Sequence, residues 1–203
     1  MVSKIDICNQ GLVLIGANLI ASFTDNTVES KVANQLYETT LRAMLTKARW
    51  RFATKQEQLT KLTVDPLDKW DSAYQIPNDT ILIHTATVSD SVILYDRYNE
   101  YLYTNTGQND VVVLHYTYQP HEKEFPDYFT QALVFELASL FAGAIARNDQ
   151  LSLLYEKRAR QQLVVARSME SQTQTSRKLN TSLLIEVRNR GTASGVRAVV
   201  PDS

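Results

Sequence analysis

The chain has 203 residues, of which 44% are hydrophobic and 21% are charged, as in an ordinary globular protein that can bury a sizeable core. A net charge of −1 excludes a strong overall attraction to nucleic acid or to an anionic membrane. The single cysteine, Cys8, excludes an intramolecular disulfide and a thiolate metal cluster within one chain.

A first amphipathic helix is predicted over residues 3–16. Ser3 is a good N-cap residue, and Asp6 lies near the positive end of the helix dipole. Apolar side chains then recur at helical spacing, and Cys8 is one of them. We therefore expect Cys8 to be a buried structural thiol rather than a reactive nucleophile.

A longer helix is predicted over residues 26–53, where Asn26 and Glu29 form a capping-box pattern. Apolar residues at helical spacing give it one buried face. Its polar face carries charged residues, among them Lys31, Glu38 and Arg42. The helix is expected to close with the bulky sequence Trp50-Arg51-Phe52-Ala53, whose aromatic rings need a surface that buries them.

A change of character follows at residue 54. Residues 54–80 are predicted to be a mostly irregular polar connection that ends in a turn from Tyr74 through Pro77 to Asp79. Short runs rich in β-branched and aromatic residues then predict an antiparallel meander of about four strands within residues 81–118. The runs are 81–88, 92–95, 101–104 and 111–118.

A helical pair is predicted over residues 126–147 and 150–172, because both segments have a broad apolar face. The connection between them is so short that the helices should be antiparallel neighbours. The outer face of the second helix carries Glu156, Lys157 and Arg160. We expect an α+β, mainly helical fold, in which the two helical pairs form a four-helix bundle and the antiparallel β-sheet is inserted between them.

Residues 173–203 differ in composition from the preceding domain, 1–172. From residue 176 onward, five basic and two acidic residues give a charge of +3, around one short apolar run. Such a segment cannot form its own core, so we expect an extended arm that becomes ordered on a partner. Its candidate docking residues are Leu183, Leu184, Ile185, Val187, Arg188 and Arg190.

Candidate catalytic chemistry is weak throughout the chain. His84 and His115 fall in predicted strands, but no third ligand with suitable spacing accompanies them, so we interpret them as half-buried strand residues. Asp65, Asp68 and Asp71 are the carboxylates considered for glycoside hydrolysis, and their polar setting favours solvated side chains. No phosphate-binding or dinucleotide-binding motif is present, so no catalytic, cofactor-binding or metal-binding residue is predicted.

Six tyrosines of the predicted sheet are candidates for stacking on nucleic-acid bases. They are Tyr95, Tyr98, Tyr101, Tyr103, Tyr116 and Tyr118. Arg97 is nearly the only basic residue near them, whereas tight binding of a nucleic acid requires more positive charge. We therefore favour contact with proteins over base stacking.

Several ordered marks make this chain resemble the head-to-tail adaptor proteins of short-tailed bacteriophages, the tail tubular protein A family. The resemblance covers about residues 3–170. Its main packing and turn marks are Trp50, Phe52, Tyr74, Pro77 and Asp79. Further marks are Asn9, Leu12, Ile15-Gly16-Ala17, Ile20, Asp25 and Leu59.

The resemblance implies a structural virion protein that forms a ring, typically of twelve copies, between the portal and the tail nozzle. The implied partners are the portal protein, a tubular-B-like nozzle protein, tail fibres, and genomic DNA that passes through the lumen without sequence-specific binding. No run approaches the roughly 18 apolar residues of a membrane span, and the first residues lack the apolar core of a secretory leader. We expect assembly in the host cytoplasm and a final location at the portal vertex of the virion.

A ring subunit needs two different side faces, because contacts between successive copies are heterologous. The expected subunit–subunit residues are Lys31, Glu38, Arg42, Glu156, Lys157 and Arg160. A head-completion or stopper protein, a tail-associated glycan hydrolase and a single-strand nucleic-acid module remain as alternative functions.

Overall fold

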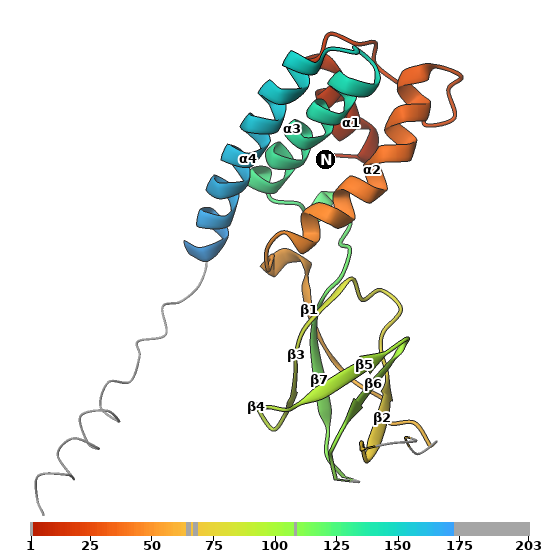
Figure 1. Ribbon diagram of the computed structural model, residues 1–203, viewed down its shortest axis with the longest axis vertical. Coiled ribbons are helices and arrows are strands. Elements are labelled where there is room, and N and C mark those ends of the chain that lie inside the picture. The colour runs from red at the N-terminus through yellow and green to blue at the C-terminus, as the bar shows by residue number, and fades with distance from the viewer. Residues whose placement is uncertain (1, 64–65, 67–68, 108, 173–203) are drawn as a thin grey trace, which may run out of the picture. The chain divides into compact units, whose positions relative to one another are not determined.

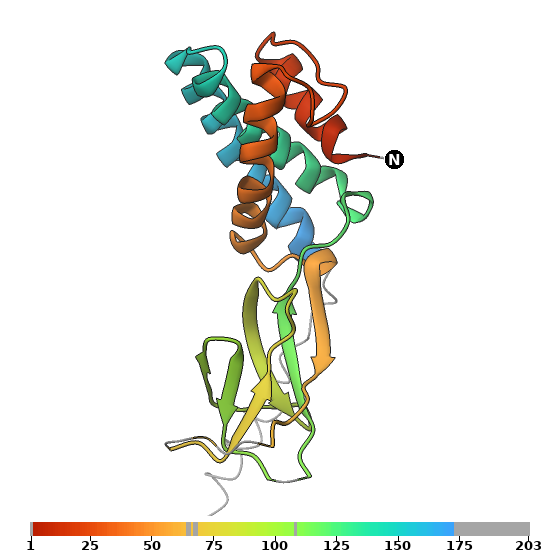
Figure 2. The same cartoon turned by 90° about the vertical axis from the view of Figure 1, so that its right-hand side faces the viewer.

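The computed structural model describes residues 2–63, 66, 69–107 and 109–172 (Figure 1). These residues form four α-helices and two antiparallel sheets, so the fold is of the mixed α+β class. Two helices precede the strands in the chain and two follow them. In both Figure 1 and Figure 2 the helices gather in one group and the strands in another. The expected arm, with its apolar run and arginines, lies outside the described residues.

Helix α1 (Lys4–Leu14) begins as the sequence predicts. The Ser3 hydroxyl accepts a hydrogen bond from the Asp6 backbone at 3.2 Å, and Asp6 Oδ2 accepts one from the Ser3 backbone at 2.9 Å. Gly16 follows the helix with φ +71°, a conformation that favours glycine. Cys8 is fully buried, as predicted, and burial raises the pKa of its thiol to about 12.

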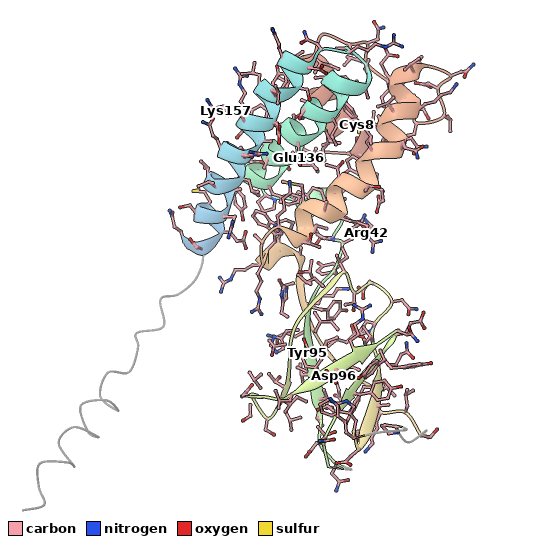
Figure 3. The ribbon with its side chains drawn as sticks, in the orientation of Figure 1. Cys8, Arg42, Tyr95, Asp96, Glu136 and Lys157 are labelled. Carbon is pink, nitrogen blue, oxygen red and sulfur yellow. The ribbon has the colours of Figure 1, made fainter. Side chains whose placement is uncertain are left out.

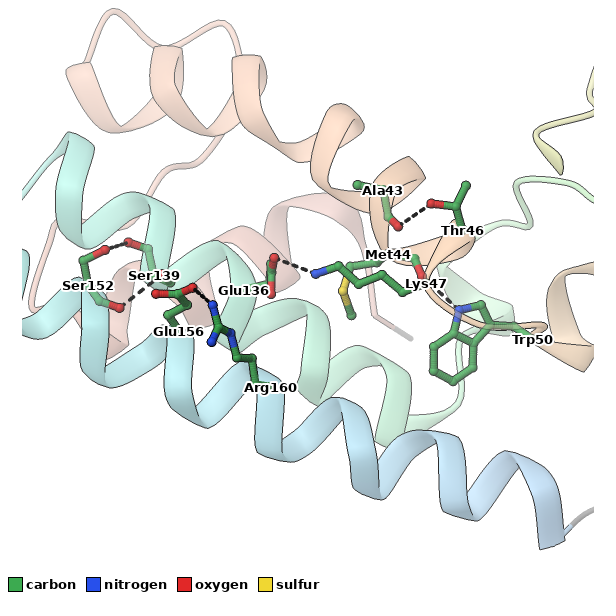
Figure 4. A network of polar contacts seen from close by, with 10 residues as sticks. All are labelled: Ala43, Met44, Thr46, Lys47, Trp50, Glu136, Ser139, Ser152, Glu156 and Arg160. Atoms are coloured by element: carbon green, nitrogen blue, oxygen red, sulfur yellow. Dashed lines mark hydrogen bonds and ion pairs between the residues drawn. The ribbon is translucent and has the colours of Figure 1, made fainter.

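Helix α2 (Val28–Thr46) corrects two details of the predicted helix 26–53. Thr27, not Asn26, is the N-cap, and its hydroxyl accepts from the Ser30 backbone. The helix ends at Thr46 because the chain turns to bury Trp50, whose Nε1 donates to the Met44 carbonyl at 2.9 Å (Figure 4). A short 3₁₀ helix, Arg51–Ala53, follows.

Helices α3 (Asp127–Ala144) and α4 (Asp149–Gln172) lie close to the predicted boundaries. Asn148 begins α4 by accepting a hydrogen bond from the Leu151 backbone. The two helices meet through a stacked pair, Phe135 and Tyr155, and through reciprocal hydrogen bonds between Ser139 and Ser152 (Figure 4). Helix α3 also packs on α1 and α2, so it is the central element of the helical core.

The strand region corrects the predicted single meander of four strands. The described strands number seven and belong to two sheets, ordered β1-β7-β3-β4 and β2-β6-β5. They are β1 (Thr54–Gln58), β2 (Ser72–Gln75), β3 (Leu82–Val88), β4 (Ser91–Val92), β5 (Tyr95–Tyr98), β6 (Tyr101–Thr104) and β7 (Val112–Thr117). The predicted run 92–95 divides between β4 and β5, and the segment 54–80, expected to be irregular, contains β1 and β2.

The hidden strand β1 has a physical explanation. Its sequence, Thr-Lys-Gln-Glu-Gln, is exposed at almost every position, so it lacks the apolar alternation that identifies a strand. As an edge strand it is held by backbone hydrogen bonds to β7, with Thr54 opposite Thr117 and Gln58 opposite Val113.

The two groups of elements have separate hydrophobic cores. The helical core includes Trp50, Phe129 and Phe141, and the strand core includes Tyr74, Leu102 and Leu114. Because the strand core takes residues from both sheets, the sheets stabilise each other across it. None of the helices in the described part of the chain has the length and apolar character needed to cross a bilayer.

Truncating Trp50 should destabilise the fold strongly, because its side chain is fully buried between Phe52 and Phe129. We expect Trp50→Ala to lower the free energy of unfolding by about 3–5 kcal/mol, and Trp50→Phe by about 1–3 kcal/mol through the lost hydrogen bond and volume. Urea denaturation measures both. Leu94→Ala, at a position 85% exposed, is the control, and an equal loss in that variant would contradict the prediction.

Candidate functional site

The residues on which the resemblance rests lie in the turns and connections between helices and strands. The Asn9 side chain accepts from the Ile20 backbone at 2.9 Å and donates to the Ile20 carbonyl at 3.0 Å, which ties the loop after α1 to that helix. Asp25 Oδ2 accepts from the backbones of Ala21 and Ser22, both at 2.9 Å. These hydrogen bonds to the backbone fix the path of the chain from α1 to α2, which is a structural role.

The aromatic mark after α2 forms the base of the helical core. Phe129 is contacted edge-on by Trp50, Phe52 and Phe125, with ring centroids between 4.9 and 5.2 Å away. Such edge-to-face contacts are stabilising beyond the area that they bury. The need to complete this cluster explains why the chain leaves the helix before Trp50.

The turn residues Tyr74, Pro77 and Asp79 lie beside the strand core. Tyr74 is 1% exposed, and its hydroxyl lies 2.8 Å from Thr106 Oγ1. Asp79 accepts from the Tyr116 hydroxyl at 3.0 Å and pairs with Lys55 Nζ at 2.8 Å. Burial alone would raise the pKa of Asp79, but these two hydrogen bonds outweigh it and the net direction is downward.

Tyr116 is the centre of a polar cluster between β1, β7 and the Asp79 turn. Its side chain is buried, and its hydroxyl also lies 2.7 Å from Glu57 Oε2. Burial and the two neighbouring carboxylates raise the pKa of Tyr116, and its single hydroxyl hydrogen is shared between Glu57 and Asp79. The cluster joins the strand edge to the turn that precedes β3.

Glu170 is a buried carboxylate that we did not predict from the sequence. It is 6% exposed and accepts from the Arg51 backbone at 2.6 Å and from the Tyr128 hydroxyl at 2.5 Å. These bonds attach the end of α4 to the chain that leaves α2. The available signal was an acidic residue one turn after Ala166 on the apolar face of the helix.

The charged residues expected on subunit–subunit faces lie at exposed or half-buried positions of α2 and α4. They are Lys31, Glu38, Arg42, Glu156, Lys157 and Arg160. Figure 3 shows Arg42 on α2 and Lys157 on α4, each pointing away from the helical core.

Some of these charged side chains have a partner within the chain and others have none among the described residues. Lys31 donates to Asn26 Oδ1 at 2.7 Å, Glu38 lies 3.7 Å from Lys4 Nζ, and Glu156 pairs with Arg160 one turn further on (Figure 4). Arg42 and Lys157 form no ion pair within the described part of the chain.

Exposed apolar side chains mark two further surfaces that sequence periodicity missed. On α4, Leu153 is 64% and Val164 is 67% exposed. At the β4–β5 corner, Val92 is 74%, Leu94 is 85% and Tyr98 is 54% exposed. Isolated exposed apolar residues are common, but groups of them on one element are typical of binding surfaces.

A groove of about 1040 Å³ lies between α1 and α3. Its apolar lining consists of Val2, Val13, Leu14, Leu19, Val134 and Phe135. Asp6 and Asp127 add two carboxylates, and no Lys or Arg is among its lining residues. The groove depends on how two distant helices pack, so no local pattern predicts it.

The candidate chemical residues have ordinary structural settings. His84 Nε2 lies 2.8 Å from Thr117 Oγ1, and burial, Arg49 and His115 lower the pKa of His84. Among the described residues, no three His, Cys, Asp or Glu side chains are grouped so that they could hold a metal ion. The Asp71 backbone donates to Asn105, while Asp65 and Asp68 lie outside the described residues.

The tyrosines expected on the sheet do not share one setting. Tyr116 is buried, Tyr98 is exposed and packs edge-on against Tyr103, and Tyr118 donates to Glu124 Oε2. Tyr98 is therefore the most accessible aromatic ring of the strand region.

Comparison with known proteins adds no assignment, since no protein-family model matches the chain and no curated protein matches it.

Replacement of Asp79 should change how stability depends on pH. Because the pKa of folded Asp79 lies below the ordinary value of 3.8, its ionised form stabilises the fold above that pH, and this contribution fades as pH falls. We expect Asp79→Asn to be less stable than the wild type at pH 7 and the difference to shrink below about pH 4. Urea denaturation across pH 2.5–7 measures it. Glu100→Gln, outside this cluster, is the control; a difference independent of pH would contradict the prediction.

Proposed function

We propose that this protein is a head-to-tail adaptor of a short-tailed bacteriophage, a structural virion protein that forms a ring of twelve copies between portal and tail nozzle. Genomic DNA passes through the lumen of this ring without sequence-specific contacts. The proposed domain is residues 1–172, with residues 173–203 as an extended arm. The four helices act as one bundle in each subunit.

The proposal rests on two observations together: the order of the helices and strands along the chain, and the residues at the turns that connect them. Two helices on each side of a β insertion share one hydrophobic core, while the insertion has its own. The marks that resemble the adaptor family, from Asn9 to Asp79, lie at the turns and junctions that fix this plan. Residues with that role preserve an architecture rather than a reaction.

The surfaces suit a part that joins other proteins. The exposed apolar corner at Val92, Leu94 and Tyr98 offers a platform for the nozzle, far along the chain from the arm. The arm supplies Leu183, Leu184, Ile185 and Val187 for strand addition to the portal, and Arg188 and Arg190 for ionic contacts.

The direct test is the mass of the purified chain, alone and with portal-bearing particles, by light scattering and negative-stain imaging. A ring, either free or formed on the portal, supports the adaptor function. A chain that stays monomeric in the presence of portals contradicts it.

Portal binding by the arm and nozzle binding by the apolar corner should be lost independently of each other. We expect deletion of residues 176–203 to abolish portal binding and to leave nozzle binding unchanged, because the residues of both described hydrophobic cores precede residue 173. We expect Leu94→Asp to weaken nozzle binding at least tenfold and to leave portal binding unchanged, because it places a charge in the apolar corner. Pull-down assays with each partner measure both effects, and circular dichroism checks the fold. Loss of both partners in either variant would contradict this assignment.

A further inference from the structure

The outer side of α4 carries a stripe that is both apolar and basic. Leu153, Lys157, Arg160 and Val164 follow one another at intervals of four, three and four residues, which places them on one side of the helix. Both apolar members are about two-thirds exposed. The buried residues Ala159 and Ala166 lie on the opposite side, so this outer stripe points away from the core of its own subunit.

The groove between α1 and α3 has the complementary character. Its floor is apolar, with Val13, Leu14 and Val134, and its carboxylates are Asp6 and Asp127. The hydrogen bonds from Ser3 hold the pKa of Asp6 below its usual value, so this carboxylate is charged at neutral pH. The groove therefore presents negative charge around an apolar surface.

We infer that the outer stripe of α4 in one subunit binds the α1–α3 groove of the next copy, and that this contact builds the ring. The inference rests on the proposed adaptor function, and it replaces the expected α2 face by the groove. It names a second copy of this chain as the occupant of the groove.

Charge selects this pairing over its alternatives. Two α4 stripes facing each other, as in a twofold dimer, would oppose Lys157 and Arg160 to the same residues of the partner, and like charges there are destabilising. A stripe in the groove instead places Lys157 near Asp6 and Asp127, together with Arg160, which also pairs with Glu156 of its own helix. The contact is heterologous, because the two surfaces differ, and repeated heterologous contacts form a ring when the rotation between successive copies closes.

The dimensions agree as well. Leu153 and Val164 are three helical turns apart, or about 16 Å along the axis. The groove follows α3 from Asp127 to Phe135, which is about 12 Å along that helix. The two lengths therefore agree to within about 4 Å, so that Leu153 and Val164 lie at the two ends of the groove and the basic side chains lie between them.

A charge exchange tests the inference in the full-length protein. The stripe variant carries Lys157→Glu and Arg160→Glu, and the groove variant carries Asp127→Lys and Gln131→Lys, all at exposed positions. Each variant alone opposes like charges at every contact, so we expect ring formation to require at least tenfold more protein. In an equimolar mixture every alternating contact is again complementary, and rings of even order should form near the wild-type concentration.

Light scattering and negative-stain imaging follow assembly, with portal-bearing particles added if the wild type assembles only there. Lys61→Glu, at an exposed position of the strand region, is the matched control and should assemble like the wild type. Rings formed by either variant alone at wild-type concentration, or no rescue by mixing the two folded variants, overturn the inference but not the adaptor function. A wild type that forms no ring under either condition overturns both.

Disulfide trapping gives an independent readout. Cys8 is buried, so the wild type provides a background without accessible thiols. Val13→Cys lies in the groove at a position 60% exposed, and Val164→Cys lies in the stripe. Under mild oxidation the double variant should form a ladder of linked chains, while a mixture of the two single variants should stop at dimers. Absence of cross-links in assembled rings would contradict the contact.

Discussion

The fold depends on one pair of neighbouring segments, which we call the crossing: the segment by which the chain leaves the helical core and the segment by which it returns. The Tyr118 backbone donates to the Ala53 carbonyl at 2.9 Å, directly beyond the pairing of β1 with β7. The outgoing and returning segments are therefore hydrogen-bonded neighbours. Because of this, α2 and α3 can pack on each other although the whole strand region separates them in the chain. The aromatic cluster around Phe129 and the carboxylate of Glu170 lie on the helical side of the crossing, and the Tyr116 cluster lies on the strand side.

The proposed functional surfaces follow from this arrangement. Leu153 and Val164 lie on the outer side of α4. They are exposed because α3 packs against the opposite side of this helix. The groove lies between α1 and α3, and both helices line it with large apolar side chains and with one carboxylate each. The strand region contributes a different exposed corner at Leu94. Separate elements thus offer separate surfaces, as the proposed adaptor function requires.

Periodicity predicts the elements that bury one face and fails where burial is decided by distant partners. The helices α1, α3 and α4 were predicted because apolar residues recur at helical spacing over several turns. Strand β1 was missed because an edge strand held by its backbone needs no apolar side chain. The early end of α2 was missed because Trp50 fits the helical stripe equally well, and only its contact with Phe129 shows that it has left the helix. Glu170 and the groove likewise depend on residues far apart in the chain.

The closeness of Ala53 and Tyr118 also bears on how the chain folds. Joining α2 to α3 through an unstructured excursion of roughly 64 residues would cost about 3 kcal/mol more in loop-closure entropy than joining them through a connection of a few residues. Once β1 pairs with β7, that excursion is closed by its own hydrogen bonds, and the two helices become near neighbours in effective contour length. We therefore expect strand pairing in the insertion to favour docking of the helices, although Ile81 is the one apolar side chain in the described part of residues 54–117 that packs against their core.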